Sequence, residues 1–474
     1  MEGAFQPLDY AVLIAYIAGV TAFGAFLGAR QRNARDYFLA GRAIPWWAIC
    51  FSVVATETSA LTFISVPATA YTSDFWFLQL AFGYLLGRIA IVVVLLPRYF
   101  RGELVTAYQL LEQRFGLLAR RFASVIFMVT RALADSVRIF AAAIPITLIS
   151  GLSYWEAIVV AGLFTLAYTY YGGLRAVVWV DVVQMGLYVL GGIVALVVLS
   201  MMLPDGWGTI MSVGAQADKF RIVHTEGGFA SPRWILTGLV GGAFLSMASH
   251  GVDHIIVQRL LAASSLRDAR RALIGSGFVV IAQFLLFLFV GAALFAYYGG
   301  RTFQELGLTA ADEIFPLFIV EGLPPGLSGL IVAGILAAMM STVASSLNSL
   351  ASATTHDLYA PLAHREGDDE HLMRMGKRFT LLWGVILIGG ATLFVFVQQG
   401  QPIVVIALQI ASFTYGGLLG GFLLGIVSRR AEQRDAITGM AAAIVLMAVL
   451  WALQQFGVVP RFIDSLWFSL LGSV

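Results

Sequence analysis

The chain has 474 residues, of which 59% are hydrophobic and only 12% are charged, and its formal net charge is +2. No soluble domain has this balance, and the sequence contains no nucleotide-binding loop, catalytic triad or cysteine–histidine cluster, which argues against an enzyme. The single cysteine, Cys50, excludes an internal disulfide. We expect neither a nucleic-acid partner nor an organic cofactor.

Apolar runs of about 20 residues recur along the whole chain, which predicts a polytopic α-helical membrane protein. The first residues carry no basic region before an apolar run, so we do not expect a cleaved signal peptide. A last apolar piece, 462–474, is too short to span a bilayer alone. The predicted spanning segments, in chain order, are 8–30, 43–71, 74–98, 118–149, 154–171, 174–203, 233–262, 268–299, 325–355, 374–399, 402–427 and 434–457.

Lysine and arginine are distributed unevenly between the predicted loops. If the N-terminus lies outside, three of the 29 basic residues lie deep within segments, and most of the rest fall in inner loops or at the segment ends beside them. Cytoplasmic loops carry such an excess of positive charge. We therefore predict a cell inner membrane protein with its N-terminus outside. The outer loops hold only Lys219, Arg221, Arg233, Arg301 and Arg461.

The second segment contains a cluster of polar residues that is unusual for a membrane helix. Thr56, Glu57, Thr58, Ser59 and Thr62 fall within eight residues. An ionisable residue inside a membrane segment is costly and usually functional. The cluster predicts a helix interrupted near the membrane middle, where unwound carbonyl groups can bind a cation or a solute. The alternative is a kinked helix whose polar residues serve packing only.

The fourth segment carries Arg131, Asp135 and Arg138. Spacings of four and three residues place them on one helix face, where Asp135 can pair with either arginine. Because this face is net positive, one arginine is a candidate to bind an anionic solute, with Glu57 as a competing partner. The alternative is a structural network in which every charge is satisfied.

The sixth and seventh segments add further polar candidates. Asp181 lies near the inner end of the sixth segment, where it would either complete a cation site or pair structurally with an arginine. The seventh segment contains Ser246, Ser249, His250 and Asp253. Two histidines four residues apart in a kinked helix are only weak evidence for zinc.

The ninth segment carries a stripe of hydroxyl groups. At about 100° per residue, Ser341, Thr342, Ser345, Ser346 and Ser349 fall on one helix face. Hydroxyl oxygens suit a hard cation that has lost its water. Small polar residues also let helices pack closely and bond back to their own carbonyl groups, so the stripe alone leaves both interpretations open.

Taken together, these features resemble the sodium:solute symporter family over essentially the whole chain. The shared motifs are Asp36–Arg42 before Pro45-Trp46-Trp47, Ala55–Phe63, Thr106–Gly116, Gly172–Gln184, His250–Asp253 with Val257–Arg259, and Ala338–Ser349. The resemblance implies an all-α fold like that of the leucine transporter, with two inverted repeats of five helices. It also implies this division: 1–42 as an extra N-terminal helix, 43–203 and 233–427 as the repeats, 204–232 as an external loop, and 428–474 as a C-terminal helix with a short final helix.

The resemblance also implies candidate sites. The main sodium site would use carbonyl groups of Ala55, Thr58 and Ala338 with the hydroxyl groups of Ser341 and Thr342. A second sodium site, as in the sialic acid branch, would use Ser345, Ser346 and Asp181. We therefore expect one or two coupling sodium ions. The candidate substrate-binding residues are Glu57, Ser59, Thr62, Phe77, Gln79, Arg131, Asp135, Arg138, Ser246, Ser249 and Gln409.

The predicted function is sodium-coupled import of a small organic solute by alternating access, through a protein that works as a monomer in the lipid bilayer. An organic acid, such as sialic acid, is favoured. A sugar, amino acid or other zwitterion is the alternative, although the lack of lysine between Arg271 and Arg301 argues against a galactose-type site. A sodium channel and a proton-coupled carrier using Glu57 or Asp181 are the competing classes.

Overall fold

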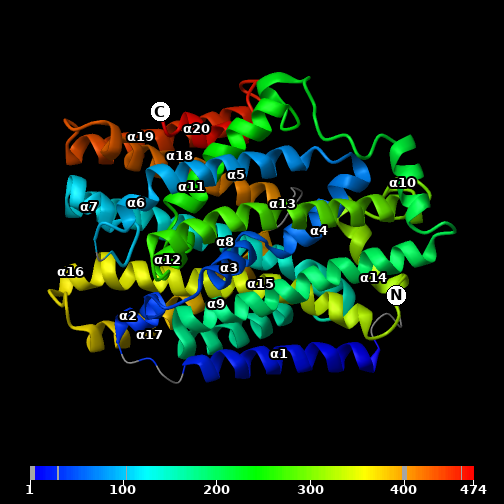
Figure 1. Cartoon of the computed structure of the whole chain (residues 1–474), viewed down its shortest axis with the longest axis horizontal. Helices are drawn as coiled ribbons and strands as arrows, with labels where there is room; N and C mark the ends of the chain where they lie inside the picture. Colours follow the sequence, from blue (N-terminus) through cyan, green and yellow to red (C-terminus); the bar gives the residue numbers. More distant parts are fainter. Residues whose placement is uncertain (1–5, 29–30, 32, 103, 398–402, 461) are drawn as a thin grey trace.

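A computed structural model describes residues 6–28, 31, 33–102, 104–397, 403–460 and 462–474. The long helices run roughly side by side along the longest axis of the molecule (Figure 1). Seven of the described helices are long and apolar enough to cross a membrane, and a bent pair makes an eighth span. The predicted helical membrane architecture is therefore confirmed.

The first half of the chain follows the predicted segments closely. The fifth and sixth segments form one kinked helix, α9, rather than two separate ones. The helices are α1 (Pro7–Gly28), α2 (Ala34–Leu39), α3 (Trp46–Glu57), α4 (Ala60–Thr72), α5 (Phe77–Val94), α6 (Leu96–Tyr99), α7 (Gln109–Phe115), α8 (Leu117–Ser150) and α9 (Tyr154–Met202).

The second half contains the remaining segments and two short helices, α10 and α14, in the long loops 204–232 and 300–324. The last piece of the chain forms a 3₁₀ turn (Ser465–Trp467) followed by four residues of α-helix, which are too short to span a bilayer. The elements are α10 (Trp207–Gln216), a π-helical turn (Thr237–Gly241), α11 (Gly242–Gly251), α12 (His254–Leu261), α13 (Leu266–Tyr297), α14 (Ile314–Glu321), α15 (Leu327–Ala353), α16 (Ala360–Ala363), α17 (Asp369–Val397), α18 (Ile403–Val427), α19 (Gln433–Gln455) and α20 (Phe468–Leu471).

Helix α15 forms the centre of the bundle. It packs against α9, α1, α8, α17 and α3, and almost every one of its residues is buried. A helix that is apolar on most sides and shielded from lipid must be surrounded by other helices. The hydroxyl stripe of α15 is therefore in contact with neighbouring helices and not with lipid.

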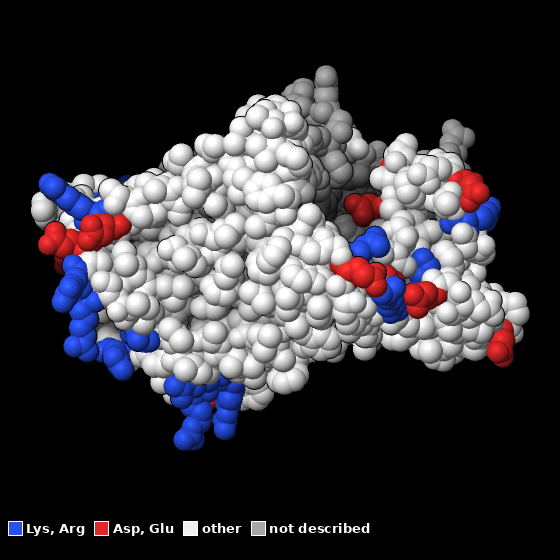
Figure 2. Space-filling model, turned by 90° about the horizontal axis from the view of Figure 1, so that it is seen from above, with Lys and Arg blue, Asp and Glu red and all other residues white. Residues whose placement is uncertain are grey.

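Charged side chains gather at the two ends of the molecule, and an uncharged belt separates them (Figure 2). One end, where α2, α7 and α16 lie, carries mainly lysine and arginine, whereas the opposite end, where α10 and α14 lie, carries both signs (Figures 1 and 2). This arrangement agrees with a protein that spans a bilayer and has a positive excess on one side.

The loop between α9 and α11 is attached to the end of α4. Lys219 Nζ donates hydrogen bonds to the carbonyl oxygens of Tyr71, at 2.6 Å, and Ser73, at 2.9 Å. Burial lowers the pKa of Lys219, because desolvation disfavours its charged form. Lys219 therefore packs this loop against the rest of the protein.

Gly173 bends α9 between its two predicted segments. Its backbone has φ 51° and ψ −155°, which only glycine adopts readily, and a Cβ atom there would lie 2.4 Å from the carbonyl oxygen of Tyr37. We expect Gly173→Ala to destabilise the protein by about 1–3 kcal/mol, measured by denaturation of the purified protein. Gly186→Ala is the matched control, since it lies in α9 with open space around it. Equal stability of the two variants would contradict this account.

Candidate functional site

The second segment is interrupted where the sequence predicts. Helix α3 ends at Glu57, Thr58 and Ser59 have extended backbone with ψ of 113° and 170°, and α4 begins at Ala60. The two halves of the segment are bent by 64°. The last carbonyl groups of a helix have no intrahelical partner, so this break presents free backbone oxygens inside the bundle.

The seventh segment is interrupted as well. Helix α11 ends at Gly251, and Asp253 has extended backbone before α12 begins. The Asp253 side chain caps α12 by accepting a 2.9 Å hydrogen bond from the N–H of Ile255. In transporters built from inverted repeats, broken helices at corresponding positions of the two halves mark the binding site.

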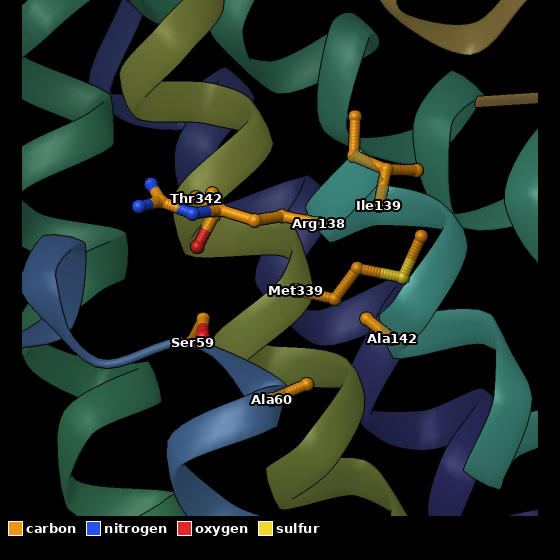
Figure 3. A pocket seen from close by; sticks show the side chains of 7 residues that line it. All are labelled: Ser59, Ala60, Arg138, Ile139, Ala142, Met339 and Thr342. Carbon is orange, nitrogen blue, oxygen red and sulfur yellow. The ribbon is translucent and has the colours of Figure 1, made fainter. Parts of the chain in front are cut away.

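The hydroxyl stripe of α15 lies directly against the first break. Thr56 Oγ1 is 3.2 Å from Ser345 Oγ, and Ser59 and Thr342 line one small pocket between α4, α8 and α15 (Figure 3). Thr342 donates a 3.1 Å hydrogen bond to the carbonyl oxygen of Ala338. The structure thus brings Thr342, one member of the predicted main sodium site, beside the break at Thr58 and Ser59. Ala55 lies in the last turn of α3, and the Ser341 hydroxyl group donates to Asp181.

Asp181 is fully buried and belongs to a network that includes residues not predicted for the site. It accepts hydrogen bonds from Ser341 Oγ at 2.6 Å and Ser52 Oγ at 2.5 Å, and it pairs with Arg259 Nη2 at 3.1 Å. Arg259 also donates to Ser345 Oγ. A buried carboxylate needs a counter-charge, and pairing with an arginine was one of the two alternatives that the sequence left open for Asp181; the sequence did not indicate Arg259.

The predicted members of the second sodium site are therefore divided in this structure. Ser345 reaches Asp181 through the guanidinium group of Arg259, whereas Ser346 Oγ donates a 2.5 Å hydrogen bond to Asp135 Oδ2. The Ser346 side chain thus contacts the carboxylate of α8 and not that of α9.

The two candidate arginines of α8, Arg131 and Arg138, have different surroundings. Arg131 is buried and donates to Asp253 Oδ2 from Nε at 2.9 Å and from Nη2 at 2.5 Å, with a further bond to the Tyr415 hydroxyl at 2.7 Å. Arg138 pairs with Asp135, at 3.1 Å, and its side chain is 20% exposed compared with 6% for Arg131. Arg138 also lines the pocket beside Ser59 and Thr342 (Figure 3). Of the two side chains, that of Arg138 is the more exposed, and it is the one that lines the pocket.

Glu57 does not compete for the arginines of α8, in contrast to the prediction. Its carboxylate forms an ion pair with Arg88 of α5 and lies 3.3 Å from Nε2 of His250, near the end of α11. Arg88 is fully buried. A buried guanidinium needs a nearby carboxylate, and the end of α3 supplies Glu57. The triad thus links the two interrupted segments.

Four of the remaining predicted substrate residues, Ser246, Ser249, Gln79 and Phe77, contact other groups of the protein. Ser246 donates a 3.0 Å bond to the Tyr84 carbonyl oxygen, and Ser249 Oγ lies 2.8 Å from His250 Nδ1. Gln79 Nε2 donates to the Arg233 carbonyl oxygen at 2.9 Å, and the ring of Phe77 is 5.2 Å from that of Phe284. Thr62 lies partly buried in α4, one turn from the break, and the side chain of Gln409 lies outside the described part of the chain.

The chain is similar to known sodium symporters over most of its length. The chain is 31% identical to the sodium/sialic acid symporter SiaT of Proteus mirabilis over 462 residues, covering 93% of this chain and 89% of SiaT. It is 30% identical to the sodium/sialic acid symporter NanT of Aliivibrio fischeri, covering 94% and 88% of the two chains.

The fold is also similar to that of a solved transporter. A substrate-bound, outward-open structure of a Na⁺-coupled sialic acid symporter superposes with a TM-score of 0.88 at 29% identity, covering 99% of this chain and 96% of the other. The model of the sodium:solute symporter family matches residues 37–443. This chain therefore belongs to the sodium:solute symporter family.

Proposed function

We propose that this sodium-coupled symporter imports a small organic acid and that Arg138 binds the acid's carboxylate. The observation that carries the proposal is the position of Arg138 in the pocket beside Ser59 and Thr342, between the broken helix and the hydroxyl stripe. A guanidinium group binds carboxylates in a two-pronged geometry that an ammonium group cannot match. The sialic acid symporters to which the chain is similar carry a solute of this class.

Sodium would bind where the first break meets α15. The proposed ligands are the carbonyl groups of Ala55, Thr58 and Ala338 with the hydroxyl groups of Ser341 and Thr342, all of them oxygens, as a hard cation requires. A second ion at Ser345, Ser346 and Asp181 would need Arg259 to release Asp181 and Ser345, because its guanidinium group now contacts both.

The proposed mechanism is alternating access. Sodium binding stabilises the outward-facing state, the acid then binds beside the break, and the bundle turns inward. The sodium gradient supplies the driving force, because each ligand favours the same states of the protein. The two interrupted segments support the proposed division into repeats at 43–203 and 233–427.

We further propose that the protein is a cell inner membrane transporter with its N-terminus outside, that it functions as a monomer, and that no residue has a catalytic role. The end that carries the basic excess, where α2, α7 and α16 lie, would then face the cytoplasm (Figures 1 and 2).

Uptake into liposomes containing the purified protein tests the proposed function. An inward sodium gradient should drive saturable uptake of sialic acid or another carboxylate, and replacing sodium with choline should abolish it. Sodium conductance without solute and without saturable counterflow would instead show a channel. Uptake driven by a pH gradient in sodium-free medium would show a proton-coupled carrier, and uptake only of neutral sugars would contradict the proposed solute class.

The role of Arg138 has its own test. We expect Arg138→Met to raise the half-saturating acid concentration by about 10- to 100-fold, because a hydrogen bond to a charged group contributes roughly 1.5–3 kcal/mol. Arg138→Lys keeps the charge but not the two-pronged contact, so its half-saturating acid concentration should lie between those of the wild type and Arg138→Met. The measurement is the concentration dependence of sodium-driven uptake. An unchanged half-saturating concentration in both variants would contradict the assignment.

A further inference from the structure

A buried carboxylate, Asp135, joins the pocket arginine to the hydroxyl stripe of α15. Asp135 Oδ2 accepts a 2.5 Å hydrogen bond from Ser346 Oγ, and Oδ1 is 3.1 Å from Arg138 Nη1. The residue is fully buried in α8, so water does not screen these contacts. A single side chain thus touches both the proposed solute-binding group and the helix proposed to bind sodium.

The distribution of charge around Asp135 gives this link a consequence. Arg131 is neutralised mainly by Asp253, which it contacts through two nitrogens, and it lies farther from Asp135, at 3.4 Å. Asp135 is therefore the anion that neutralises Arg138 when no solute is bound. A solute carboxylate at Arg138 would place a second negative charge beside Asp135, which is unfavourable unless a cation lies close by.

The hydroxyl stripe is in the right place to supply that cation. Thr342 precedes Ser346 by one helical turn, so the two side chains are neighbours about 5–6 Å apart on the same face. Thr342 also lines the pocket with Arg138. A sodium ion bound at Thr342 would therefore offset the repulsion between Asp135 and the carboxylate of the solute.

We infer that Asp135 is a positioning residue that couples the two ligands: it holds Arg138 when sodium is absent, and bound sodium allows Arg138 to accept the acid. The inference rests on the proposed function. By linkage, the acid must raise the affinity for sodium by the same factor by which sodium raises the affinity for the acid.

The test compares the affinity for sialic acid at saturating and at trace sodium, measured by calorimetry on the purified protein. The wild-type ratio of the two affinities should lie within about 5- to 150-fold, as is typical of such coupling. Asp135→Asn keeps the size and hydrogen-bonding ability of the side chain but removes its charge. We expect the ratio of the two acid affinities to fall toward one in this variant, because the acid binds more tightly at trace sodium. A purely structural role of Asp135 would not produce this gain in affinity.

Two further variants complete the experiment. Ser346→Ala keeps the charge of Asp135 and removes only its contact with α15, so the ratio should fall partway. Ser349→Ala is the matched control, since its hydroxyl group donates to the Ser346 carbonyl oxygen of its own helix, and its ratio should equal that of the wild type.

The outcomes separate this inference from the proposed function. If Asp135→Asn weakens acid binding equally at both sodium concentrations, the coupling role is wrong. If Asp135→Asn does not fold, an unchanged ratio in Ser346→Ala overturns the inference by itself. Both proposals are overturned if the wild-type protein binds sialic acid without any dependence on sodium, or if it binds no carboxylate at all. The inference alone is overturned if the wild type depends on sodium but the variants have the same ratio of affinities as the wild type.

Discussion

Replacing Arg131 with methionine is expected to destabilise the protein by about 3–5 kcal/mol. Arg131 is the buried partner of Asp253, which lies in the break of the seventh segment, and its removal leaves that carboxylate without a counter-charge. Breaking a buried ion pair on one side costs far more than the pair contributes, because the remaining charge stays desolvated. Denaturation of the purified protein in mixed micelles measures the effect.

The double variant Arg131→Met with Asp253→Asn is the control for this prediction. It removes both charges, and the side-chain amide oxygen that it introduces can still accept the hydrogen bond of the Ile255 N–H that caps α12. We expect it to recover most of the lost stability, whereas Arg131→Met alone should not fold well enough for normal yield. A single variant as stable as the wild type would show that Arg131 has no structural role.

Removing the hydroxyl group of Thr342 is expected to raise the half-saturating sodium concentration at least about 10-fold, which corresponds to roughly 1.4 kcal/mol. Thr342→Val keeps the branched shape of the side chain and deletes one of the proposed sodium ligands. This hydroxyl group donates to the Ala338 carbonyl oxygen of its own helix, so the variant breaks no hydrogen bond to a side chain in the described part of the protein. Sodium-dependent thermal stabilisation reports binding without transport.

Ser349→Ala again provides the comparison, because it removes a buried hydroxyl group of the same helix two turns away. Its sodium dependence should match that of the wild type. Equal sodium dependence of Thr342→Val and the wild type would place the ion elsewhere. A fall in solute affinity with no change in sodium affinity would assign Thr342 to the solute pocket instead.

The sequence by itself determined the helical membrane architecture and the position of the first break. These follow from local properties: apolar runs of sufficient length form spanning helices, and the polar cluster around Glu57 cannot continue an ordinary membrane helix. The stripe of α15 is local in the same sense, because the helical period alone places its hydroxyl groups on one face. Such features depend only on residues near one another in the chain.

Only the tertiary structure decided which charge faces the pocket. Arg131 and Arg138 lie four residues before and three residues after Asp135, so the helical period allows either to be its partner. In the structure Asp135 contacts both arginines, but Asp253, which is 122 residues from Arg131, forms the shorter contacts with Arg131, and Arg138 is the arginine that lines the pocket. A charged partner such as Asp253 comes from a distant segment of the chain. Its identity depends on how the helices pack against one another, and the spacing of residues within one helix does not specify that packing.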